Sequence, residues 1–125
     1  MYSISELLHE SNNGKNFDIL FGDFLDIFYR IDKSFQIMII NDCPSDIDIE
    51  KHPVNAALLA SAVHKLANDH NLPVPSWVYK RCFYLSKPFF GGNASGNLRW
   101  WFMYKSPPEF KHRNLFVCEN ILKRV

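Results

Sequence analysis

The chain has 125 residues, of which 47% are hydrophobic, 15% aromatic and 22% charged. This composition excludes an intrinsically disordered chain, and the length predicts one compact domain over residues 1–125. Uncharged apolar stretches such as residues 35–40 are far shorter than the roughly 20 residues that cross a bilayer. Because the N-terminus also has no basic segment typical of a secretory signal, we expect a soluble cytoplasmic protein without membrane contact.

The formal net charge of +1 is divided unevenly along the chain. Residues 1–50, the acidic half, contain ten acidic and three basic residues, a net charge of −7. Residues 51–125, the basic half, contain three acidic and eleven basic residues, a net charge of +8. Such an asymmetry predicts either a nucleic-acid or acidic partner for the basic half, or two halves that fold against each other.

Helices are predicted for most of the acidic half. Ser3 and Glu6 have the spacing of a capping box, which predicts a short helix over residues 4–10. Residues 16–32 place apolar side chains at steps of three and four with aspartates elsewhere, a pattern typical of an amphipathic helix. Residues 34–40 fit either a buried strand or a short buried helix, and the helix is favoured because no nearby segment offers a hairpin partner.

A turn or loop at residues 42–46 leads toward the most regular helix of the chain, residues 54–70. Pro53 is well placed to begin this helix, because the first helical position needs no N–H donor. Its alanine-rich face allows neighbours to approach closely, so we expect it at the centre of a bundle. Pro73 and Pro75 prevent the helix from continuing.

The remaining chain predicts short helices joined by irregular segments. Ser76 can cap a short turn, and a helix is expected over residues 98–104. Ser106 and Glu109 have the spacing of a second capping box, which predicts a short basic helix over residues 110–114. The predicted fold is therefore all-α: a compact single-domain bundle of about five to six helices with a short irregular Pro/Gly-rich segment.

No group of residues has the spacing of a catalytic, cofactor or metal site. The glycine-rich loop at residues 91–97 matches neither the G-x-x-x-x-G-K-[ST] nor the G-x-G-x-x-G phosphate-binding motif. His64 and His70 are six positions apart, which places them on opposite faces of a helix. We therefore expect no metal, no cofactor and no enzymatic activity, unless folding brings together distant residues such as His64, Asp69 and His112.

The three cysteines, Cys43, Cys82 and Cys118, are an odd number at wide spacings. They form no C-x-x-C pair, and no histidine lies at zinc-ligand spacing from them. Free thiols in a reducing compartment are the expected state.

Residues 77–113 interleave aromatic and basic side chains and form the strongest candidate binding region. These side chains can pack in the core, contact a protein partner, or stack on the bases of single-stranded nucleic acid while the cations follow its phosphates. Trp100 and Trp101 cannot both face one direction on a helix, so one is expected in the core and the other at a partner surface. Phe110 and Leu115 are expected to anchor the helix that carries the surface. The predicted partner-binding residues are Arg99, Trp101, Lys111, His112 and Arg113.

The basic half also resembles a known family. The segments L-P-V-P-S-W (residues 72–77) and S-P-P-E-F-K-H-R-N-L-F (residues 106–116) are similar to an uncharacterised bacterial domain. That domain follows the DNA-binding segment of helix-turn-helix regulators, some of which look like antitoxins. The resemblance implies a partner-binding module and brings no catalytic residues. No helix-turn-helix is recognisable in the acidic half, so sequence-specific DNA binding is not expected.

These observations predict a non-enzymatic protein-binding module, antitoxin-like or regulatory, with a toxin among the candidate partners. The alternative is a single-stranded nucleic-acid-binding protein that uses the basic, aromatic half. The identity of the partner and the oligomeric state stay open at this point.

Overall fold

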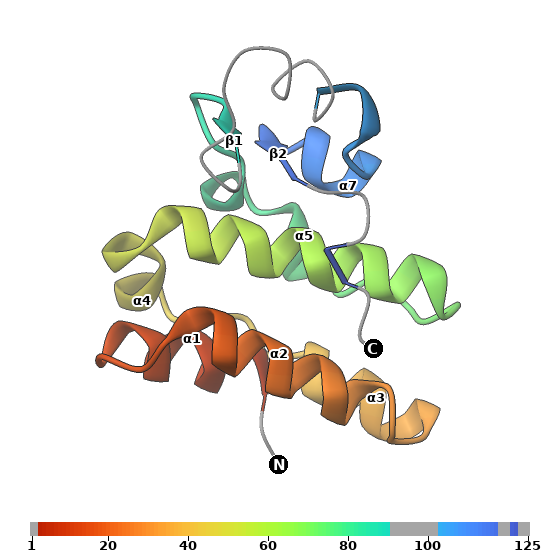
Figure 1. Cartoon of the computed structure of the whole chain (residues 1–125). Helices are drawn as coiled ribbons and strands as arrows, with labels where there is room; N and C mark the ends of the chain where they lie inside the picture. Colours follow the sequence, from red (N-terminus) through yellow and green to blue (C-terminus); the bar gives the residue numbers. More distant parts are fainter. Residues whose placement is uncertain (1–2, 91–102, 118–120, 123–125) are drawn as a thin grey trace.

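The computed structural model describes residues 3–90, 103–117 and 121–122. These residues are mostly helical, and their strands are two segments of two residues each, so the all-α prediction is confirmed. The helices α1 to α4 lie in a lower layer, α5 crosses the middle of the molecule, and the elements that follow α5 lie above it (Figure 1).

Each helix of the lower layer begins at a side chain that caps it. Helix α1 (Ile4–Asn12) begins after Ser3, whose hydroxyl accepts a hydrogen bond from the Glu6 amide, as the capping-box spacing predicts. Helix α2 (Phe17–Phe28) is capped by Asn16, and α3 (Lys33–Ile40) by Asp32. The helix predicted over residues 16–32 therefore ends at Phe28, because Asp32 caps the next helix. The choice of helix for residues 34–40 is confirmed.

A short helix after the predicted loop escaped the sequence analysis. Helix α4 (Asp46–Lys51) begins at Ser45, whose Oγ accepts a hydrogen bond from the Asp48 amide at 3.3 Å. Its six residues are too few to show a helical period, so only the capping residue marks it.

Helix α5 (Pro53–Asp69) forms the centre of the core, as its alanine-rich face predicts. It contacts α1, α4, α7 and two short 3-10 helices, η1 (Ser76–Tyr79) and η2 (Arg81–Phe83). Apolar side chains of α5 are fully buried on more than one face, among them Ala57, Leu59 and Val63. A helix that is apolar around most of its circumference must be covered on both sides, which explains its place between the two layers.

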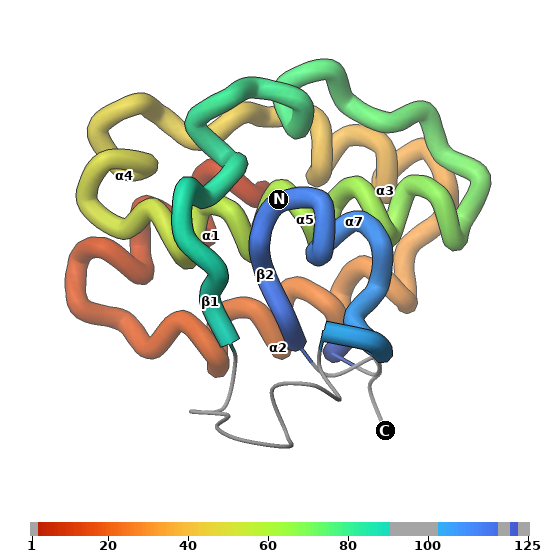
Figure 2. The backbone as a smooth tube through the Cα atoms, turned by 90° about the horizontal axis from the view of Figure 1, so that it is seen from above, coloured from red at the N-terminus to blue at the C-terminus, as the bar shows by residue number. Residues whose placement is uncertain are grey.

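The upper layer contains helix α7 (Pro108–Lys111) and a pair of short parallel strands. Strand β1 (Phe89–Phe90) pairs with β2 (Leu115–Phe116), in the register Phe89 to Leu115 and Phe90 to Phe116. Figure 2 shows the two strands side by side above α5. This pairing joins segments that are distant in the sequence, so the local pattern did not indicate it.

The prediction of a capping box at Ser106 and Glu109 is wrong. Helix α7 begins after Pro107, and no side chain caps its N-terminus. The buried Ser106 instead donates to the Val117 carbonyl at 2.9 Å, and its Oγ accepts from the Val117 amide at 2.8 Å. Ser106 therefore closes the loop that contains α7 and β2. Of the helix expected over residues 98–104, the part before residue 103 lies outside the described residues.

Side-chain hydrogen bonds tie the acidic half to the basic half. Trp77 donates from Nε1 to the Ile40 carbonyl at 3.1 Å, and Tyr29 donates from its hydroxyl to the Leu122 carbonyl at 2.7 Å. The ion pairs of His9 with Asp48, Lys15 with Glu10 and Lys65 with Asp69 each lie within a single half. Apolar packing and hydrogen bonds join the two halves.

None of the helices in the described part is long and apolar enough to span a bilayer.

Candidate functional site: an apolar groove between the layers

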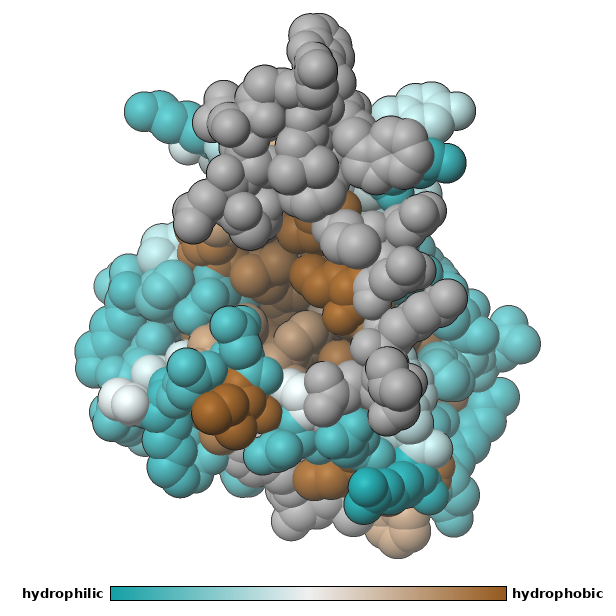
Figure 3. Space-filling model, viewed as in Figure 1, coloured by the Kyte–Doolittle hydropathy of each residue, from teal (hydrophilic) through white to brown (hydrophobic). Residues whose placement is uncertain are grey.

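An apolar groove lies where α2, α5 and the upper layer meet. It consists of two adjoining hollows of about 240 and 400 Å³ that share four residues, Phe17, Asp18, Leu58 and Ile121. Figure 3 shows the hollowed apolar surface between the layers. Concave, mainly apolar hollows are where proteins commonly bind ligands.

Each wall of the groove comes from a different segment. The α2 wall presents Phe17, Phe21 and Leu25, at steps of four residues along one helix face. The rings of Phe17 and Phe21 stack at 5.8 Å between centroids, which fixes their orientation. Val54 and Leu58 of α5 form the floor. The upper-layer wall consists of Phe89, Phe110, Val117 and Ile121.

The two predicted anchors of the basic helix are in place. Phe110 and Leu115 are fully buried, and Phe110 also lines the groove. Helix α7 therefore turns an apolar side chain toward the groove. The basic side of this segment was predicted to be the contact surface, whereas the concave apolar surface lies next to Phe110.

The expectation of an exposed Arg113 is wrong, because only 1% of this residue is accessible. Its guanidinium donates to the Val78 carbonyl at 2.7 Å and to the Glu109 carbonyl at 2.9 Å. It also lies 4.8 Å from the centre of the Tyr84 ring. Arg113 joins α7 to the 3-10 helix η1 and is not available to a partner.

The remaining predicted contact residues divide into two groups. His112 is exposed, and Lys111 is half-buried and donates from Nζ to the Tyr104 carbonyl at 2.8 Å. Tyr104 is 74% exposed, and Lys105 Nζ is 5.3 Å from the centre of its ring. Arg99 and Trp101 lie outside the described residues.

Of the three residues named as a possible distant cluster, Asp69 pairs with Lys65 at 2.9 Å, whereas His64 contacts Arg113 and Tyr79. His112 lies close enough to His64 for its positive charge to lower the pKa of His64. Among the described residues, no group of three or more histidine, cysteine or acidic side chains could hold a metal ion. Cys43 and Cys82 are free thiols; Cys118 lies outside the described residues.

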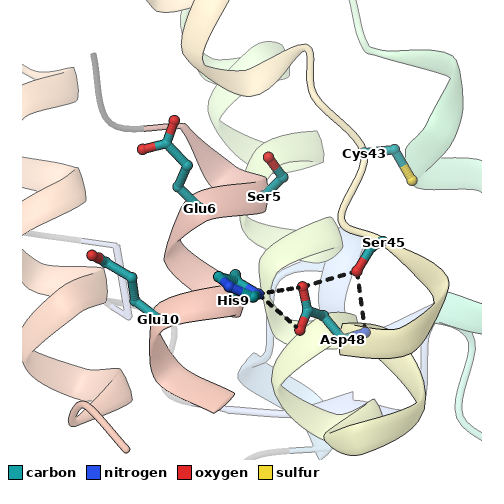
Figure 4. A pocket seen from close by; sticks show the side chains of 7 residues that line it. All are labelled: Ser5, Glu6, His9, Glu10, Cys43, Ser45 and Asp48. Atoms are coloured by element: carbon teal, nitrogen blue, oxygen red, sulfur yellow. Dashed lines mark hydrogen bonds and ion pairs between the residues drawn. The ribbon is translucent and has the colours of Figure 1, made fainter. Parts of the chain in front are cut away.

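A second, polar pocket lies between α1 and α4 (Figure 4). At its centre the buried carboxylate of Asp48 lies 3.3 Å from Nδ1 of His9 and accepts a hydrogen bond from Ser45 Oγ at 2.9 Å. Asn12 donates to the Asp48 backbone carbonyl at 2.9 Å. Burial raises the pKa of Asp48, but the hydrogen bonds from Ser45, Asn12 and His9 outweigh this effect and hold the pKa below its usual value.

The His9–Asp48 pair acts as a link between helices. Nucleophilic catalysis requires the free histidine nitrogen to face a hydroxyl or thiol. Nε2 of His9 instead lies 3.1 Å from Nδ2 of the Asn13 side chain. The side chains of Glu6, Glu10 and Cys43 point away from the pair in Figure 4. The pair therefore connects α1 to α4 with a buried, well-partnered carboxylate.

The groove was not predicted because its walls come from residues far apart in the chain. The stripe of Phe17, Phe21 and Leu25 was visible in the sequence, but it was expected to be covered by the core. Which part of such a stripe stays open depends on how α2 packs, and no local pattern contains that information.

Comparison of the chain with protein-family models, curated proteins and solved structures found no match.

Proposed function

We propose that this protein is a non-enzymatic protein-binding module that holds an apolar segment of a partner protein in the groove between its layers. The observation that carries this proposal is the open groove between the partly exposed side chains of Phe17, Phe21, Val54 and Leu58, with the buried Phe110 behind them. Two adjoining hollows along one helix suit a ligand with several apolar side chains in a row, as an amphipathic segment of a protein has. The resemblance of residues 72–77 and 106–116 to the region after regulator DNA-binding segments favours an antitoxin-like or regulatory role, with a toxin as one such partner.

The test uses the full-length protein and the product of a neighbouring gene, which is the first partner to try. Val54→Glu places a charge in the groove but lies in the first turn of α5, where an acidic side chain is compatible with the helix dipole. We expect binding to weaken about tenfold or more. Met38→Glu is the matched control, because Met38 is an exposed apolar residue on α3 that does not line the groove.

Titration calorimetry measures the affinity, and circular dichroism melting confirms that both variants are folded. Equal affinity of the wild type and the folded Val54→Glu variant would contradict the proposal. An equal loss of affinity in both variants would also contradict it, because the loss would then come from the added charge and not from the groove.

A second candidate function, binding of single-stranded nucleic acid, is favoured by the surroundings of Tyr104. Tyr104 is exposed, Lys105 lies over its ring and Lys111 contacts its backbone carbonyl, an arrangement that can stack on a base and contact phosphates. This function predicts affinity for a labelled oligonucleotide that falls steeply with salt and is reduced by Tyr104→Ala. Affinity that does not depend on salt would eliminate it.

A further inference from the structure

The rim of the groove carries a negative charge. Among the described residues that line the two hollows, Asp18 is the one with a full charge at neutral pH, and it lines both. His52, which lines only the hollow of about 400 Å³, is the other titratable side chain of this lining. An otherwise apolar groove with one acidic residue on its rim distinguishes between partners by charge.

Asp18 has no ion-pair partner in the described part of the chain. Lys15, three residues earlier, pairs with Glu10 at 3.2 Å, and the other ion pairs lie elsewhere. Asp18 lies in the first turn of α2, where the helix dipole stabilises a carboxylate without a cation. Its carboxylate is exposed and available to an incoming group.

The layer that carries Asp18 reinforces this charge. It is built from the acidic half, whose net charge is −7. A partner that covers Asp18 without a cation would remove this carboxylate from water with no compensation, and an anionic partner would be repelled. A lysine or arginine beside the apolar side chains avoids both costs.

The spacing of the α2 wall indicates what shape of partner fits. The partly exposed side chains of this wall, Phe17 and Phe21, are four residue steps apart, about 6 Å at the rise of an α-helix, and the buried Leu25 lies one turn further. One to two turns of a partner helix cover this length and present apolar side chains at positions i and i+3 or i+4. Asp18 follows Phe17, so the cation belongs near the end of the partner that contacts Phe17.

We propose that the segment bound in the groove is a cationic amphipathic helix, with apolar side chains in the hollows and a lysine or arginine paired with Asp18. This inference rests on the proposed function, because it specifies the partner chemistry for the same groove.

The test uses two fluorescein-labelled amphipathic helical peptides of equal length, one built from leucine and lysine and the other from leucine and glutamate. Fluorescence anisotropy measures their affinity for the full-length protein. We expect the leucine/lysine peptide to bind at least about tenfold more tightly. Asp18→Lys should reverse this preference. Asp23→Lys is the matched control: it makes the same charge change at an exposed position of α2 outside the groove lining, and should change the affinity about twofold or less.

The outcomes separate this inference from the proposed function. If Val54→Glu weakens both peptides but Asp18→Lys acts no more strongly than Asp23→Lys, the cation preference is wrong and the groove remains a protein-binding site. If the folded Val54→Glu variant binds both peptides as the wild type does, the groove is not the binding site and both proposals fail. Failure of the leucine/lysine peptide to bind the wild type would overturn the inference.

Discussion

Arg113 donates a hydrogen bond from its guanidinium to Nδ1 of His64, 3.3 Å away, across the contact between α7 and α5. Because a guanidinium can only donate, Nδ1 must be the acceptor, and the proton of a neutral His64 lies on Nε2. Nε2 lies 3.5 Å from the Tyr79 hydroxyl. The neutral form of His64 is therefore part of the contact that positions the upper layer on α5.

Replacing Arg113 with methionine should lower the free energy of unfolding by about 2–4 kcal/mol. Methionine retains much of the buried stem but leaves the carbonyls of Val78 and Glu109 without their donor. Urea unfolding followed by circular dichroism measures the change. Arg30→Met, at an exposed arginine after α2, is the control and should change stability by no more than about 0.5 kcal/mol. A loss at Arg113 as small as that at Arg30 would show that the buried guanidinium does not stabilise the fold.

Stability should fall as the pH falls below 6.5, through the protonation of His64. Burial lowers the pKa of His64 from its usual 6.5, and the positive charges of Arg113 and His112 lower it further, against the opposing effect of Glu109. The unfolded chain therefore binds this proton at a higher pH than the folded chain does. The stabilising contribution is complete above pH 6.5 and is lost as the pH falls toward the folded pKa.

His64→Gln tests this origin, since glutamine retains an acceptor for Arg113 but does not titrate. Urea unfolding at a series of pH values should show a shallower dependence below pH 6.5 for His64→Gln than for the wild type. His112→Gln, at an exposed histidine, should keep most of the wild-type slope. Identical slopes in the wild type and His64→Gln would assign the dependence to other groups.

Asp48→Asn should destabilise the link between α1 and α4 by about 1–3 kcal/mol at neutral pH. An amide NH₂ cannot accept the hydrogen bonds that Ser45 and His9 make to the carboxylate. Because the folded pKa of Asp48 lies below 3.8, its contribution is present above pH 3.8 and is lost as the pH falls through the folded value. Asp46→Asn, at an exposed acid in the same first turn, is the control for the helix dipole. Equal effects at the two positions would leave no role for the buried network.

Tyr29→Phe should weaken the attachment of residues 121–122 to the lower layer. The substitution removes the hydrogen bond of 2.7 Å to the Leu122 carbonyl and should cost about 1 kcal/mol. Thermal unfolding measures the cost. Tyr79→Phe removes a hydroxyl that is 3.5 Å from its nearest partner, so it should have a smaller effect. The reverse order of the two effects would contradict this account.

Local patterns predicted most of the helical fold. Ser3 marks the start of α1, the apolar spacing marks α2, and the alanine-rich stretch marks α5 as the central helix. These signals act within one or two helical turns, so the sequence contains them in full. Ser106 shows the limit of such signals. Its spacing from Glu109 predicted that its hydroxyl caps α7, but the hydroxyl forms hydrogen bonds with Val117 instead.

Most of the helices, the apolar faces they must bury and the unequal charge of the two halves follow from the sequence. The burial of Arg113 under Tyr84, the pairing of β1 with β2 and the part of the α2 face that stays open beside Asp18 follow only from the folded structure. The difference comes from the range of the interactions. Hydrogen bonding and side-chain spacing along one helix depend on neighbours in sequence, whereas burial and the shape of a groove depend on segments that meet only after the chain has folded.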